Sequence, residues 1–357
     1  MEKLYKDRII KFSMLTDQEI LDARQLLQDA VNPLYFFDDD TDGLNSFLVL
    51  RKKFGRGIGI PIKTSPELDV SYASNVDEIQ PDLVVILDKP LVAKEFFERV
   101  KVPIMWVDHH PIIAVKNIHY FNPRVHDEKD ARPTTYQCYL IAGEESWESL
   151  LGCIGDWYLP DFYNDFLKKY PDLLKPATDV GEVIYGTRFG ELTRIFMFLL
   201  KGKPDEIRKN ISTLLKIQTP YEILDEATPA GKYLAKRIEK PMKEYKELLD
   251  KAIKEATDEN LLVYIYPGSK NSYTGELANE LFYRFPKKLI IVGREKNGEI
   301  KMSLRSNLLK LPTIIEKALV GIKGYGGGHD QASGGCVSQE DFERFIKNIK
   351  DEITNKI

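Results

Sequence analysis

The stretch that decides the fold is Tyr35-Phe36-Phe37-Asp38-Asp39-Asp40-Thr41-Asp42-Gly43. Its aromatic residues are typical of a strand, and Gly43 lets the chain turn directly after the acids. Alternate residues at a strand end project the same way, so Asp38, Asp40 and Asp42 can aim their oxygens at one point. Carboxylates held that close repel one another unless a cation lies between them, and oxygen ligands suit Mg²⁺ or Mn²⁺. Taken alone, the stretch is equally consistent with a solvated acidic turn.

The residues that follow predict an α/β fold with a mainly parallel sheet. Apolar strands and helices alternate along this part of the chain: Gly57–Ile62, Pro81–Asp88 and Val102–Val107 as strands, and Leu44–Phe54 and Lys94–Val100 as helices. Continuous apolar strands of this kind are typical of a parallel sheet whose two faces are both covered. Acids follow three of the strands. Because ligands bind at the carboxyl ends of strands in such sheets, we expect a site there.

Composition and charge bound the class of protein. At 357 residues, with 43% hydrophobic and 30% charged residues, the chain is long enough for two globular domains. The net charge of −4 argues against a protein that coats nucleic acid, although it allows a local basic groove. The three cysteines, Cys138, Cys153 and Cys336, are widely spaced and indicate reduced core residues.

The sequence also predicts a cytoplasmic protein without a membrane partner. The N-terminus shows no apolar signal region, and the longest apolar run, near Ile195–Leu200, is far too short to span a bilayer.

The second half of the chain predicts a linker and a smaller α/β domain. Helices are expected at Thr134–Ala142 and Trp147–Ile154, and residues 161–225 are helical with breaks at Gly186 and Gly190. A long charged helix, Gly231–Ala256, is of the kind that bridges domains. We therefore predict a first domain at 1–229, a linker helix at 230–257 and a second domain at 258–357, which closes with a helix at Gln339–Ile353.

Two further groups of residues favour a metal site. Asp108-His109-His110 ends the strand Val102–Val107, and carboxylate and imidazole are both metal ligands. Asp156, in Gly152-Cys153-Ile154-Gly155-Asp156, is another candidate. Each group alone is also consistent with an ordinary polar loop or helix end. Together with the acids of the neighbouring strands they favour the metal hypothesis.

The second domain contains a glycine-rich stretch that predicts phosphate binding. Gly324-Tyr325-Gly326-Gly327-Gly328-His329 lets backbone N–H groups approach a phosphate, and a His can donate to it. Arg305, followed by Ser306, comes after a strand, and its guanidinium can bind phosphate with two hydrogen bonds. A flexible turn and a solvated Arg are the alternatives.

These motifs, in this order, resemble the DHH/DHHA1 phosphoesterase superfamily over nearly the whole chain. Within it the sequence is most similar to archaeal RecJ-like nucleases, through Ser272–Glu280 and Gly152–Pro160 as well. The resemblance implies an N-terminal DHH domain, a C-terminal DHHA1 domain and two Mn²⁺ or Mg²⁺ ions.

The resemblance also implies a role for each matched residue. The metal ligands would be Asp38, Asp40, Asp42, Asp88, His109 and Asp156. Asp42 or Asp88 would bridge the ions, Asp108 would orient His109, and His110 would face the phosphate. Arg305, Ser306, Gly326, Gly327, Gly328 and His329 would hold the nucleotide. Two positions depart from the pattern: Asp38 stands where some members have His, and Lys89 follows Asp88 where a small residue is common.

The function implied is an exonuclease for single-stranded DNA or RNA in repair or replication, with 3′→5′ polarity because shorter archaeal forms tend that way. Three alternatives stay open: a nanoRNase or nucleoside bisphosphate phosphatase, a pyrophosphatase, and a replisome scaffold. A helicase or replisome protein is the partner that the resemblance implies, and the oligomeric state is left open.

Overall fold

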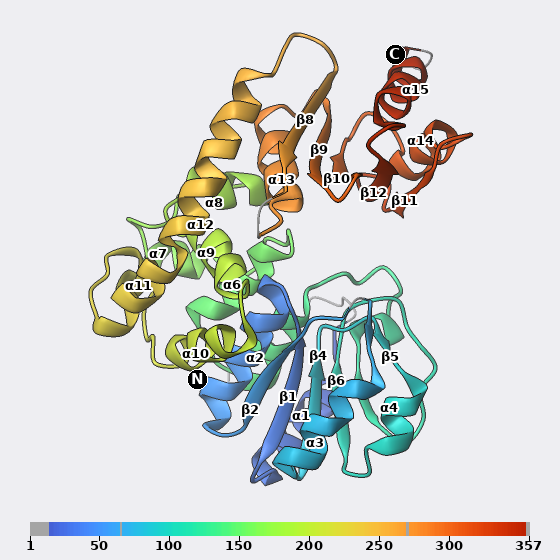
Figure 1. Cartoon of the computed structure of the whole chain (residues 1–357). Coiled ribbons are helices and arrows are strands. Elements are labelled where there is room, and N and C mark those ends of the chain that lie inside the picture. Colours follow the sequence, from blue (N-terminus) through green and yellow to red (C-terminus); the bar gives the residue numbers. More distant parts are fainter. Residues whose placement is uncertain (1–13, 65, 269–270, 355–357) are drawn as a thin grey trace. The chain divides into compact units, whose positions relative to one another are not determined.

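The computed structural model describes residues 14–64, 66–268 and 271–354 (Figure 1). The sequence predicts a lead-in and an amphipathic helix over residues 1–30, of which residues 1–13 lie outside the described residues. The chain forms two compact units, and the boundary between them lies between Arg237 and Ile238. The helix α12 (Pro229–Lys254) carries the chain from one unit into the other. Among the described helices, none combines the length and the apolar character needed to cross a membrane.

A five-stranded sheet with every pairing parallel forms the core of the first unit, as predicted. Its strand order is β2-β1-β4-β6-β7. The strands are β1 (Pro33–Asp38), β2 (Ile58–Ile62), β4 (Leu83–Leu87), β6 (Ile104–Val107) and β7 (His119–Phe121). The edge strand β7 has no counterpart in the sequence analysis, because three residues are too few to show a periodic pattern.

Helices cover both faces of this sheet, and the alternation of side chains along β1 shows how. Phe36 packs against Phe96 of α4 (Lys94–Arg99), on the face that α3 (Ala73–Ile79) also covers. Tyr35 and Phe37 point to the opposite face and contact Phe47 of α2 (Thr41–Phe54). Residues 41–50 of α2 are all buried, because α2 lies against β1 on one side and against further helices on the other.

The remaining short elements of the first unit surround this core. They are α1 (Asp17–Asp29), β3 (Glu67–Leu68), η2 (Val70–Tyr72), β5 (Leu91–Val92), η3 (Pro123–Val125), α5 (Thr134–Ala142), α6 (Trp147–Gly155), α7 (Tyr163–Lys169), α8 (Val180–Gly186), α9 (Glu191–Leu199), α10 (Pro204–Leu214) and α11 (Tyr221–Leu224). The expected breaks are confirmed, since α8 ends at Gly186 and Gly190 caps α9. The sequence favours Asp17 as the cap of the first helix, but Thr16 caps α1 through a capping box with Glu19.

The second unit is built on a mixed sheet with strand order β11-β12-β10-β9-β8. The strands are β8 (Leu261–Pro267), β9 (Leu289–Lys296), β10 (Glu299–Arg305), β11 (Gly324–Gly328) and β12 (Ala332–Ser338). Only the β8–β9 pair is parallel among the described strands of this sheet. The helices are α13 (Thr274–Arg284), α14 (Leu311–Ala318) and α15 (Phe342–Thr354).

Two expectations for this unit are corrected. The glycine-rich stretch is neither a loop nor a flexible turn: Gly324–Gly328 is an edge strand, with Gly326 opposite Gly335 of β12. The small residues of β12 allow the two backbones to pair closely. The last helix begins at Phe342 rather than Gln339, because Ser338 and Asp341 bond to each other in a turn before it.

Candidate metal centre

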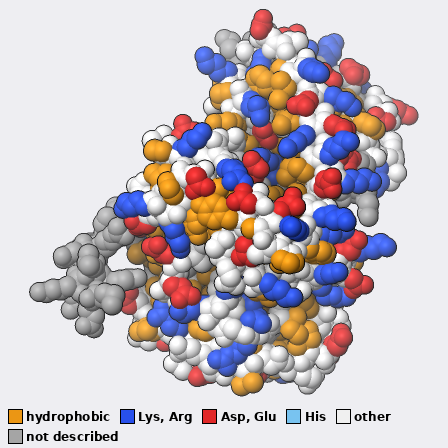
Figure 2. Space-filling view, turned by 90° about the vertical axis from the view of Figure 1, so that its left-hand side faces the viewer, with side chains coloured by type: hydrophobic (Ala, Val, Ile, Leu, Met, Phe, Trp, Pro, Cys, Tyr) orange, Lys and Arg blue, Asp and Glu red, His pale blue; other side chains and the backbone are white. Residues whose placement is uncertain are grey.

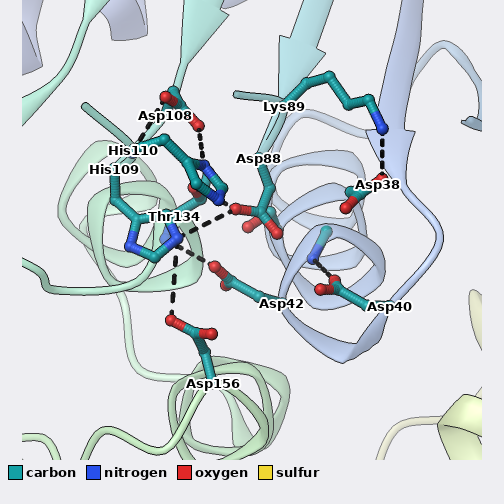
Figure 3. A network of polar contacts seen from close by, with 12 residues as sticks. Asp38, Asp40, Asp42, Asp88, Lys89, Asp108, His109, His110, Thr134 and Asp156 are labelled. Atoms are coloured by element: carbon teal, nitrogen blue, oxygen red, sulfur yellow. Dashed lines mark hydrogen bonds and ion pairs between the residues drawn. The ribbon is translucent and has the colours of Figure 1, made fainter. Parts of the chain in front are cut away.

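The predicted acids gather at the carboxyl edge of the parallel sheet. Asp38 ends β1, Asp88 follows β4, and Asp108 follows β6. Because these strands are parallel neighbours, their carboxyl ends lie along one edge. Figure 3 shows the side chains of this edge together with Asp156, which follows α6.

The first helix after β1 places Asp40 and Asp42. Asp40 is the N-cap of α2, and its Oδ1 accepts the backbone N–H of Gly43 at 2.8 Å. Asp42, which is buried, accepts the backbone N–H groups of Thr134 and Thr135 at 2.8 and 2.7 Å. A side chain at Gly43 would place its Cβ 2.5 Å from the carbonyl oxygen of Asp38, so glycine is required for this tight turn.

Asp88 is held in an unusual backbone conformation beside these acids. Its φ is +59°, in the left-handed region, and its carboxylate is almost fully buried. The hydroxyl of Thr134 donates to its Oδ1 at 3.0 Å. Such a conformation costs of order 1–3 kcal/mol, and the surrounding contacts hold the residue there.

His109 faces the carboxylates. Its Nε2 lies 3.4 Å from Oδ1 of Asp88 and 3.8 Å from Oδ2 of Asp156. Two sets of three donors have all their ligand atoms within 4.8 Å of one another: Asp42, His109 and Asp156, and Asp88, His109 and His110. His109 belongs to both sets, so the potential ligands meet around its ring.

The expectation that Asp108 orients His109 is wrong. The buried carboxylate of Asp108 contacts His110 instead, with Oδ1 2.8 Å from the ring Nδ1 and Oδ2 accepting the His110 backbone N–H at 3.0 Å. Asn122, a buried residue that was not predicted, donates to the His110 carbonyl oxygen at 2.9 Å. Asn122 and Thr134 lie outside every motif, and no pattern in the sequence identifies them.

The electrostatics of the cluster fit a divalent cation. Burial first, and then Asp38 and Asp42, raise the pKa of Asp40 to about 7. Burial and Asp42 raise the pKa of Asp156 to about 7, and burial and the neighbouring acids raise the pKa of Asp88 well above its ordinary value. These shifts come first from burial, which disfavours the charged carboxylate, and then from repulsion between neighbouring carboxylates. A set of carboxylates with one imidazole is a donor set that suits Mn²⁺ or Mg²⁺.

The residues predicted to hold a nucleotide lie together at one end of the second sheet. Arg305 ends β10 opposite Ala332 of β12, and Gly328 of β11 lies opposite Ser333 of β12. The Nε of Arg305 donates to Oδ1 of Asn279 at 2.6 Å.

The other members of this group differ in exposure. Ser306 is buried, and its Oγ accepts the backbone N–H of Leu308 at 3.1 Å. Gly326, Gly327 and His329 are exposed.

The sequence offers three aromatic residues near the motifs that could stack on a base, although core packing is the alternative for each, and they also differ in exposure. Tyr273 is buried and bonds to Glu244, so it is a core residue. Trp157, next to Asp156, and Tyr325 of β11 are both exposed. On the face drawn in Figure 2, Lys and Arg side chains are interspersed with Asp and Glu, as the net charge of −4 leads one to expect.

Known proteins resemble this chain in both units. Residues 258–355 match the family model of the DHHA1 domain. The structure of RecJ in complex with Mn²⁺ from Thermus thermophilus is 15% identical with a TM-score of 0.68, and the match covers 97% of this chain and 56% of that one. A structure of exonuclease RecJ bound to manganese is 15% identical with a TM-score of 0.58, over 95% of this chain and 94% of that one.

A third structure is that of PggH from Vibrio cholerae, described as a pGpG-specific phosphodiesterase. It is 14% identical with a TM-score of 0.51, over 91% of this chain and all of that one. The search of curated proteins finds no match. The chain spans little more than half the length of the Thermus RecJ. The chain therefore has a RecJ-like fold, and its residues 258–355 match the DHHA1 domain.

Proposed function

We propose that this protein is a divalent-metal-dependent phosphodiesterase that removes nucleotides from the end of single-stranded DNA or RNA, in the 3′→5′ direction. The observation that carries the proposal is the position of the His109 Nε2, 3.4 Å from Asp88 and 3.8 Å from Asp156 at the carboxyl edge of the sheet. Its support comes also from RecJ structures of the same fold, two of which contain Mn²⁺ and one Mg²⁺.

The residues of the first unit would have two roles, metal binding and contact with the phosphate. Asp42, Asp88, His109 and Asp156 would hold the cation, which supplies Lewis-acid polarisation of a phosphodiester and activation of water. The burial of Asp42 and Asp88 keeps their ligand oxygens fixed. Asp108 binds Nδ1 of His110 and thereby leaves Nε2 as the ring nitrogen available to a phosphate oxygen. The superfamily resemblance implies two ions.

The second unit would bind the terminal nucleotide. Because β11 is an edge strand, one side of its backbone has no neighbouring strand among the described residues, and its glycines let a phosphate approach the N–H groups on that side. Arg305 and His329 supply side-chain donors at the same end of the sheet. Tyr325 of β11 is an exposed aromatic residue suited to stacking on a base, and Trp157 is another in the first unit. A helicase or replisome protein as partner remains a prediction of the resemblance.

A second candidate function is the hydrolysis of very short oligonucleotides. The structure of PggH favours it, because the match spans the whole of that chain and nearly all of this one. Both functions use the same phosphodiester chemistry and differ in the length of strand that the protein accepts. Chain-length preference therefore separates them.

The test is an assay of 5′-labelled single-stranded DNA and RNA with Mn²⁺, in which the wild type is compared with Asp108→Ala/His109→Ala. A ladder of shortening labelled products that the double variant does not give would support the proposal. Immediate release of a labelled mononucleotide would show that digestion runs 5′→3′ instead. Cleavage of dinucleotides alone would establish the second candidate. A protein that neither cleaves any of these substrates nor binds Mn²⁺ would overturn the enzyme hypothesis and favour a scaffold.

A further inference from the structure

Lys89 is the feature of the metal centre that the superfamily resemblance does not explain. It follows Asp88 directly, yet only 1% of its side chain is exposed. Its Nζ lies 2.8 Å from Oδ1 of Asp38 and donates to the carbonyl oxygen of Thr64 at 2.8 Å. Figure 3 shows the ammonium turned toward Asp38, at the same edge of the sheet as the other acids. Asp38 is one of the residues expected to bind metal.

The packing around Lys89 holds it in this place. The indole N–H of Trp106 donates to the backbone carbonyl oxygen of Lys89 at 3.1 Å, and Trp106 itself is buried in the sheet. An unpaired ammonium at this depth costs several kcal/mol, so the ion pair with Asp38 stabilises the buried side chain. Asp38 is thereby committed to Lys89, because separating the pair leaves a buried cation without compensation.

The donors that remain form two sets that share His109: Asp42, His109 and Asp156, and Asp88, His109 and His110. The Nε2 of His109 faces both Asp88 and Asp156, and one imidazole nitrogen binds one ion at a time. Both sets of three donors found among the described residues contain His109, and neither contains Asp38 or Asp40. One oxygen of Asp40 is already engaged by the N–H of Gly43 at the start of α2. Asp42, Asp88 and Asp156 supply the carboxylates around His109. The ammonium of Lys89 neutralises the carboxylate of Asp38. The carboxylates around His109 therefore carry the negative charge that remains for a metal ion to neutralise.

We propose that the site holds a single divalent ion, bound by Asp42, Asp88, His109 and Asp156, and that the ammonium of Lys89 occupies the role of a second cation beside Asp38. The inference rests on the metal centre of the proposed function and not on its substrate. The protein thus carries a built-in monovalent cation at a position where the resemblance implies an ion taken from solution.

The stoichiometry of Mn²⁺ binding tests this inference. Native mass spectrometry and calorimetric titration of the full chain with Mn²⁺ should give one ion per chain for the wild type. Removal of the ammonium in Lys89→Ala should free Asp38 and raise the count to two. Lys89→Met, which fills more of the space left by the lysine stem, provides a second variant with the same expected count if the alanine variant folds poorly.

Two controls make the count specific. Lys63 forms the neighbouring ion pair with Asp39, an acid outside the predicted ligand set, so Lys63→Met should leave one ion per chain. Asp38→Asn combined with Lys89→Ala removes the freed carboxylate and should return the count to one.

Two ions in the wild type, or one ion in both Lys89 variants, would overturn the inference and leave the metal-dependent function intact. A wild-type protein that binds no Mn²⁺ would overturn both.

Discussion

The Oδ1 of Asp108 lies 2.8 Å from Nδ1 of His110, and this contact separates the tasks of two adjacent histidines. His109 faces the carboxylates of Asp88 and Asp156, whereas His110 is oriented by Asp108. A carboxylate behind an imidazole fixes the orientation of the ring and raises its basicity. In this protein that support goes to His110, the histidine that we propose to face the substrate phosphate.

Asp108→Asn should therefore reduce catalysis more than metal binding. We expect kcat to fall by about 10–100-fold, the usual effect of losing such a supporting carboxylate, while the Kd for Mn²⁺ stays nearly unchanged. His109→Gln, the matched change at the adjacent residue, should weaken Mn²⁺ binding directly. Steady-state kinetics and Mn²⁺ titration of both variants provide the measurement. Loss of Mn²⁺ affinity in Asp108→Asn with normal affinity in His109→Gln would contradict this division.

Bound Mn²⁺ should stabilise the fold, because it relieves the repulsion among buried carboxylates. At a free concentration of about 100 times Kd, an ion that binds only the native state adds about 2.7 kcal/mol to the free energy of unfolding. The Tm of the wild type should rise accordingly when Mn²⁺ is added. Asp156→Asn should lose most of this shift, although its metal-free form should be at least as stable as the wild type.

Differential scanning calorimetry with and without Mn²⁺ measures these shifts. Asp165→Asn, on the exposed surface of α7, is a suitable control because its partner is a solvated lysine; it should keep the full metal-induced shift. If Asp156→Asn retains the wild-type shift, Asp156 is not a ligand.

The positions of the acids were predictable because they depend on local pattern and sheet geometry. The apolar strand before Asp38 and the strand before Asp88 form β1 and β4, and parallel pairing places both acids at one edge. The requirement for glycine at position 43 is also local, because α2 approaches the end of β1 too closely for a side chain there.

The partners of these residues were not predictable, because they come from distant parts of the chain. Lys89 pairs with Asp38, 51 residues earlier in the sequence. A lysine beside an acidic strand end gives no sign that it will be buried. The strand character of Gly324–Gly328 likewise depends on its pairing with β12, since consecutive glycines have little strand propensity of their own.

Arg305→Lys should weaken substrate binding without loss of stability. Lysine keeps the charge but lacks the planar guanidinium that bonds to Asn279 and can present a second pair of donors to a phosphate. We expect KM for a single-stranded substrate to rise by roughly tenfold, the effect of one lost hydrogen bond to a charged group.

The matched control is Arg284→Lys, which alters the ion pair between the exposed Arg284 and the buried Glu280 on α13 and should leave KM unchanged. Equal kinetic effects of the two substitutions would show that Arg305 has no special contact with the nucleotide.

The glycines of β11 allow the fold and the proposed binding role to be separated. Gly328 has a φ of +142°, and a Cβ there would lie 2.8 Å from the carbonyl oxygen of Ala332, whereas a Cβ at Gly327 meets nothing within 4 Å. Gly328→Ala should therefore lower the free energy of unfolding by about 1–3 kcal/mol. Gly327→Ala should change it by less than about 0.5 kcal/mol.

Gly327→Ala nevertheless places a methyl group on the exposed edge where a nucleotide is proposed to lie. Its KM for single-stranded substrate should rise about threefold to tenfold, a loss of about 1 kcal/mol in binding, while its Mn²⁺ stoichiometry stays that of the wild type. Urea unfolding and steady-state kinetics on the same preparations distinguish the two effects. A Gly327→Ala variant with unchanged stability and unchanged KM would mean that the nucleotide does not approach this strand, because no structural damage would be available to mask a lost contact.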